Sequence, residues 1–110
     1  MPKRDAELLI EDMFEAINKI ERYTAGFDQE AFLQDEKTID AVARNLEVLG
    51  EATRQMPDDF MDQHPDIPWR QMAGLRNRIV HDYFGLDLEI IWDVVSNGIP
   101  ELKTSVASLL

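Results

Sequence analysis

Apolar side chains recur at three- and four-residue intervals along nearly all of this 110-residue chain, and no segment alternates as a half-buried strand does. This periodicity predicts four amphipathic helices, over about residues 5–23, 36–56, 69–84 and from residue 88 onwards. Short connections favour antiparallel neighbours. The sequence therefore predicts an all-α fold, an antiparallel four-helix bundle that forms a single domain over residues 1–110.

Capping residues, glycines and prolines mark the ends of these helices. Gly26 closes the first helix, and Asp28 is expected to cap a short helical turn after it. Residues 57–68 hold three prolines and four aspartates, which predicts a loop with at most a turn around Phe60 and Met61. Pro68 is placed at the first position of the third helix, and Asp87 is expected to cap the fourth.

The fourth helix carries more apolar surface than one bundle contact covers. It includes the run Ile90, Ile91, Trp92, Val94 and Val95. A symmetric homodimer that buries a second face is the favoured explanation, because small domains bury too little apolar area alone. The alternative is that Trp92 and Ile90 lie under the loop of residues 57–68. Pro100 lacks a backbone donor and is expected to kink this helix.

Composition narrows the class of protein. The chain has 22 Asp and Glu against 11 Lys and Arg, a net charge of −11, which argues against general nucleic-acid coating and predicts no DNA partner. There is no cysteine, which excludes disulfides and thiolate chemistry. No apolar run approaches the roughly 20 residues that span a bilayer, so we expect a cytoplasmic protein without a membrane partner. The two histidines lack zinc or di-iron spacing, and no phosphate-binding glycine loop appears, so neither metal nor cofactor is expected.

One segment reverses the charge of the chain. Residues 68–84 contain three arginines and one aspartate, a balance of +2 within a net charge of −11. On a helix, Arg76 and Tyr83 lie nearly in line, and Asn77 and His81 occupy the adjacent line. A histidine can exchange protons with the oxygens of a phosphodiester, and an arginine can hold its phosphate bidentately. The strip therefore suits phosphodiester chemistry.

The same residues also have a purely structural interpretation. Arg78 could pair with Asp82, four residues further on, and Arg76 could bind Glu47 or Glu51 on the second helix. The aromatic residues of the strip could belong to the core. Spacing alone leaves both interpretations open.

The spacing Arg76-x4-His81-x-Tyr83 resembles the R-x4-H-x-Y motif of the HepT-like toxins in the HEPN superfamily. Asn77 matches the polar residue that HEPN ribonucleases favour after the arginine. The resemblance covers nearly the whole chain and includes these further segments: Arg44-Asn45-Leu46-Glu47, Leu49-Gly50-Glu51-Ala52, Ile67-Pro68-Trp69-Arg70, Gly74-Leu75, Asp82-Tyr83-Phe84-Gly85, Ile91-Trp92 and Ile99-Pro100-Glu101-Leu102.

The resemblance implies an all-helical homodimer whose two motifs face one another across a cleft. It also implies a metal-independent endoribonuclease that cleaves RNA, such as a tRNA or an mRNA, through the 2′-hydroxyl. His81 would be the acid/base group and Arg76 the ligand of the phosphate and the transition state. Asn77 would position these groups, and Arg78 would lie within reach of a phosphodiester.

Toxins of this kind are paired with an antitoxin, so the resemblance implies a MntA-type nucleotidyltransferase as partner. That enzyme would neutralise the toxin by transferring AMP to Tyr83, which adds charge and bulk beside the RNA-binding strip. Two alternatives remain. One is a non-enzymatic HEPN dimer that binds the nucleotidyltransferase without cutting RNA, which the acidic composition favours. The other is a nucleotide-binding accessory domain.

Gly50 lies in the middle of the predicted second helix, where glycine costs about 1 kcal/mol relative to alanine. This cost suggests a close approach of another helix. We expect the approach to bring Glu51 to the Arg76 end of the third helix, where Glu51 orients an arginine. The alternative is that Gly50 is a neutral packing choice.

Overall fold

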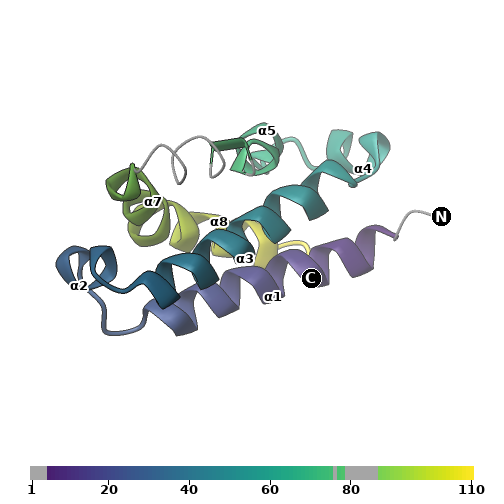
Figure 1. Ribbon diagram of the computed structural model, residues 1–110. Coiled ribbons are helices and arrows are strands. Elements are labelled where there is room, and N and C mark those ends of the chain that lie inside the picture. Colours follow the sequence, from purple (N-terminus) through teal and green to yellow (C-terminus); the bar gives the residue numbers. More distant parts are fainter. Residues whose placement is uncertain (1–4, 76, 79–86) are drawn as a thin grey trace.

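Two long antiparallel helices form the frame of the molecule (Figure 1). The computed structural model describes residues 5–75, 77–78 and 87–110. Helix α1 (Ala6–Thr24) and helix α3 (Glu36–Arg54) run side by side, and the short helix α2 (Gln29–Leu33) lies in the connection between them. The predicted first and second long helices are therefore confirmed within two residues at each end.

The later elements pack onto this pair. After the short helices α4 (Asp58–Asp62) and α5 (Trp69–Ala73), the chain continues as α7 (Leu88–Asp93), the π-helical segment η1 (Val94–Gly98) and α8 (Ile99–Ala107). Helix α5 contacts α3, α7 contacts α2, and α8 contacts α1. The described residues contain no strand, so the predicted all-α class is confirmed. No helix in that part of the chain combines the length and apolarity needed to cross a membrane.

The predicted apolar stripes form the core. On α1 the stripe of Leu9, Met13, Ile17 and Ile20 is at most 1% exposed. The stripe on α3 is buried as well, and so are most members of the stripe on α7, η1 and α8. The hydrophobic periodicity of the sequence thus fixed which side of each helix faces inward.

Aspartates start the first three helices. The side chains of Asp5, Asp28 and Asp35 each accept a hydrogen bond from a backbone N–H three residues on, at 3.0, 2.8 and 3.0 Å. Asp87 occupies the equivalent position before α7, as predicted. Its side chain does not accept a hydrogen bond from the backbone of that helix, so it does not cap α7 in the way the other three aspartates cap their helices. Gly26, with φ of +81°, makes the left-handed turn that follows the end of α1.

The apolar excess of the fourth helix is partly covered within the chain. Trp92 on α7 packs against Phe32 of α2, with ring centroids 5.1 Å apart. Helix α2 therefore provides cover for Trp92 within the chain. Val94 and Val95 are also buried, at 8% and 6% exposure.

Pro100 lies in the first turn of α8, directly after the π-helical segment. Because proline has no N–H, the hydrogen-bond ladder is interrupted there, and a π-helical turn is one way of accommodating the interruption. A bend at Pro100 and the homodimer both remain predictions.

Candidate functional site

The structure describes three of the six residues selected from the sequence. Glu51 lies on α3, and Asn77 and Arg78 follow α5 in helical conformation. Arg76, His81 and Tyr83 lie outside the described residues, as does the predicted end of the third helix at residue 84.

The segment that leads to these residues is firmly attached. The indole Nε1 of Trp69 donates to the backbone oxygen of His64 at 2.9 Å, and its ring packs edge-on against Phe60 with centroids 6.2 Å apart. Met72 and Leu75 are buried, at 0% and 3% exposure. The start of the predicted third helix is thus held in place by the contacts of Trp69 and by the burial of Met72 and Leu75.

A second attachment joins this segment to α3. The Nε of Arg54 donates to the backbone oxygen of Ala73 at 3.1 Å. That oxygen belongs to the last residue of α5, and carbonyls at a helix end lack partners within the helix. The bond fixes the exit of α5 against the end of α3.

Beyond α5 the backbone stays helical where it is described. The N–H of Arg78 donates to the oxygen of Gly74 at 3.0 Å, which is the spacing of an α-helical turn. Asn77 and Arg78 are both exposed. The alternative pairing of Arg78 with Asp82 lies outside the described residues and remains open.

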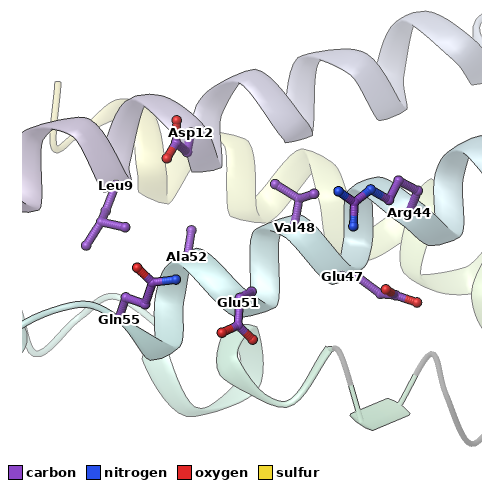
Figure 2. Close-up of a pocket in the computed structure, with 8 residues that line it drawn as sticks. All are labelled: Leu9, Asp12, Arg44, Glu47, Val48, Glu51, Ala52 and Gln55. Atoms are coloured by element: carbon purple, nitrogen blue, oxygen red, sulfur yellow. The ribbon is translucent and has the colours of Figure 1, made fainter. Parts of the chain in front are cut away.

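Glu51 borders a hollow between α1 and α3 (Figure 2). The hollow has a volume of about 480 Å³ and is lined by Leu9, Asp12, Arg44, Glu47, Val48, Glu51, Ala52 and Gln55. A neighbouring hollow of about 440 Å³ shares Asp12, Arg44 and Val48, so the two form one groove along the helix pair. In Figure 2, Glu47 and Glu51 project from α3 on the side where α5 lies.

This groove was not predicted as such. In the sequence its charged residues were interpreted as part of a solvent-exposed helix face. One sequence feature could have indicated the groove. Next to the buried stripe of α3, a second row of residues recurs at alternating intervals of three and four: Ala41, Arg44, Val48, Glu51 and Gln55. Within the described part of the chain, no three histidine, aspartate or glutamate side chains are grouped so that they could hold a metal ion.

Comparison with known proteins identifies the family. A sequence model described as ribonuclease HepT-like matches residues 13–109. The chain belongs to the HepT-like ribonuclease family. The HepT-like match spans α3, α5 and the whole sequence of the R-x4-H-x-Y motif, so the resemblance drawn from that motif is confirmed at the level of the family.

Archaeal relatives support the same assignment. A probable ribonuclease HepT of Thermococcus cleftensis is 46% identical over 101 residues, which cover 92% of each chain. A candidate RNase of Methanocaldococcus jannaschii is 44% identical over 100 residues, covering 91% of this chain and 83% of the relative. A second candidate RNase of that organism is 37% identical over 106 residues, or 96% and 97% of the two chains. No solved structure matches the chain.

Proposed function

We propose that this HepT-like protein is a toxin that acts as a metal-independent endoribonuclease. The observation that carries the proposal is the family match over residues 13–109, which includes Arg76, His81 and Tyr83 at the motif spacing. The attachment of α5 to α3 through Arg54 supports it, because catalysis requires that a motif helix be held in a fixed position.

In the proposed reaction the 2′-oxygen of a ribose attacks the adjacent phosphorus, and the bond to the 5′-oxygen of the next nucleotide breaks. The products are a 2′,3′-cyclic phosphate and a 5′-hydroxyl. His81 transfers the protons, and Arg76 stabilises the charge that develops on the phosphoryl oxygens. Asn77 orients these groups, and the exposed Arg78 binds the RNA backbone.

Glu51 has a positioning role in this proposal. It is exposed on α3, the helix on which α5 packs, so a carboxylate there is on the correct helix to orient Arg76. If Glu51→Gln left both the stability and the nuclease activity unchanged, this role would be withdrawn.

Regulation by a MntA-type nucleotidyltransferase completes the proposal. The phenol oxygen of Tyr83 would attack the α-phosphorus of ATP, forming a phosphodiester to AMP and releasing pyrophosphate. The added phosphate places negative charge where RNA must bind, and RNA is therefore repelled. Intact-mass measurement of protein made with and without its nucleotidyltransferase tests the step: added mass in AMP units, confined to the Tyr83 peptide, is expected. Unmodified protein despite an active nucleotidyltransferase would reject it.

The nuclease itself is tested with purified protein, RNA and a chelator. We expect cleavage that leaves 2′,3′-cyclic phosphate ends, no cleavage of the same sequence as DNA, and loss of at least a hundredfold in rate on His81→Ala or Arg76→Ala. His64→Gln is the matched control, because His64 packs on Phe60 at the other end of the loop before α5 and should leave the rate unchanged. A His81→Ala protein that cuts RNA at the normal rate would overturn the assignment.

A non-enzymatic HEPN module is the second candidate. The net charge of −11 favours it, since RNA is repelled by an acidic surface. It predicts tight binding of the nucleotidyltransferase without any RNA cleavage.

A further inference from the structure

Arg70 is an exposed cation without an ion-pair partner in the described part of the chain. It is the first of the three arginines in residues 68–84 and lies on α5. Glu47 and Glu51 project from α3 on the side where α5 lies, but neither pairs with Arg70 (Figure 2). A guanidinium that is neither buried nor paired adds little to stability, so its charge is available to a ligand.

The exposed face of this helix joins Arg70 to residues of the candidate site. The backbone is helical here, because the N–H of Gly74 donates to the oxygen of Arg70 and the N–H of Arg78 to that of Gly74, each at 3.0 Å. On a helix, Asn77 lies within about 20° of Arg70 and roughly 10 Å further along the axis, with Arg78 about 80° to one side. These three side chains are exposed, whereas Met72, on the opposite side, is fully buried.

Gly74 leaves the centre of this face open. It lies between Arg70 and Asn77 on the helix surface and has an ordinary φ of −75°. Among the described residues, a methyl group added at Gly74 would meet only the backbone oxygens of Arg70 and Gln71, at 3.4 and 3.5 Å. Both atoms belong to the preceding turn of the same helix. A ligand could therefore approach the backbone closely at this point.

The charges around this face are complementary to a chain of phosphates. Residues 69–78 contain three arginines and no aspartate or glutamate, within a chain of net charge −11. A further cation, Arg54, is held beside α5 by its bond to the oxygen of Ala73. Because an acidic chain repels RNA over most of its surface, the few exposed cations that lie together should dominate the contact with the RNA backbone.

We propose that Arg70 binds a phosphate of the RNA strand outside the bond that is cut, and that the face of Arg70, Gly74, Asn77 and Arg78 is a binding track for that strand. This inference rests on the proposed nuclease function and adds a phosphate subsite to it. On the predicted continuation of this helix, His81 follows Asn77 on the same line, so RNA lying along the track extends to the candidate catalytic histidine. Arg70 is a binding residue and does not act on the reacting atoms.

RNA binding at several salt concentrations tests this role. Fluorescence anisotropy of a labelled single-stranded oligoribonucleotide is measured with the inactive His81→Ala protein, so that the RNA stays intact. Adding Arg70→Gln should weaken binding about three- to tenfold and lower the slope of log affinity against log salt by about 0.7, the contribution of one phosphate contact on a single strand. Arg70→Lys should retain most of the slope, because the charge is kept.

Arg22→Gln is the matched control. It removes the same charge from an exposed arginine of α1 that stacks on Tyr23, with 5.4 Å between the guanidinium carbon and the ring centroid. The contacts of α5 are with α3, so Arg22 lies on a different helix from those that hold the track. This variant should leave both the affinity and the salt slope unchanged.

Cleavage kinetics separate binding from chemistry. In the active protein, Arg70→Gln should raise KM and leave kcat nearly unchanged, because a contact remote from the cut bond holds the substrate and the transition state equally. Gly74→Ala should also raise KM, since its methyl group fills the centre of the track. Alanine favours a helix more than glycine does, so this variant should fold, and thermal unfolding verifies it.

Three results would overturn the proposal: an unchanged salt slope for Arg70→Gln, an equal loss of slope for Arg22→Gln, and a wild-type KM for both track variants. Wild-type protein that binds RNA without cutting it would reject the nuclease, whereas the binding role of Arg70 would still be decided by the salt slope. Protein that cuts RNA and is indifferent to Arg70→Gln would reject the track alone. Absence of any RNA binding would reject both.

Discussion

The guanidinium of Arg54 binds the backbone oxygen of Ala73 at 3.1 Å, across 19 residues of sequence. This bond links the last residue of α3 to the last residue of α5. It therefore connects one of the two long helices of the frame to the segment that leads to the family motif.

Loss of this bond should loosen α5. Arg54→Ala is expected to lower the free energy of unfolding by about 0.5–1.5 kcal/mol, at the lower end because the bond is exposed. Chemical denaturation measures the change. Arg70→Ala, at an exposed position on α5, is the matched control and should change stability by less than about 0.5 kcal/mol. Equal effects of the two variants would show that the bond contributes nothing.

The contact between Phe32 and Trp92 should be the main attachment of α2. Phe32 has no exposed surface, and its ring centroid lies 5.1 Å from that of Trp92. Phe32→Ala is expected to cost about 3–5 kcal/mol, because it leaves a cavity beside the indole. Thermal unfolding and tryptophan fluorescence report the loss. Phe60→Ala, which removes a half-buried ring near Trp69, should cost clearly less; the reverse order would contradict this account of the core.

The ion pair between Lys103 and Glu21 should contribute little to stability. It joins α8 to α1 at 2.7 Å, but its side chains are 42% and 36% exposed. Water and salt screen such pairs, so Lys103→Met should cost less than about 1 kcal/mol. Lys19→Met, which breaks a pair within α1, is the control for the general effect of removing a lysine. A loss for Lys103→Met that persists undiminished in high salt would indicate packing of the lysine stem instead of charge.

Two glycines should respond in opposite ways to alanine. Gly26 has φ of +81° and open space around its side-chain position, so Gly26→Ala introduces only backbone strain, about 1–2 kcal/mol. Gly98 has an ordinary backbone, and an added methyl group would lie 3.8 Å from Val94, so Gly98→Ala should be neutral or stabilise by up to about 1 kcal/mol. Thermal unfolding of the two variants measures both effects. A Gly26→Ala variant more stable than the wild type would refute the predicted backbone strain at residue 26.

The helical frame was determined locally by the sequence. The three- and four-residue spacing of Leu9, Met13 and Ile17 defined the buried side of α1, because only a helix turns those positions to one face. Asp28 and Gly26 marked ends that the structure confirms, since capping and left-handed turns depend on neighbouring residues alone. The family motif could also be recognised in the sequence, because its three residues, Arg76, His81 and Tyr83, lie at two fixed spacings within one short segment.

Contacts between distant residues were decided only by the tertiary structure. The contact between Phe32 and Trp92 depends on how α2 packs against α7, whereas the sequence suggested a homodimer, or alternatively the 57–68 loop, as the cover for Trp92. The bond from Arg54 to Ala73 and the groove shared by Asp12 and Arg44 likewise join residues far apart in the chain. Helix periodicity specifies which face of each helix is buried, but the neighbour of each face depends on the packing of all the helices together, which no local pattern encodes.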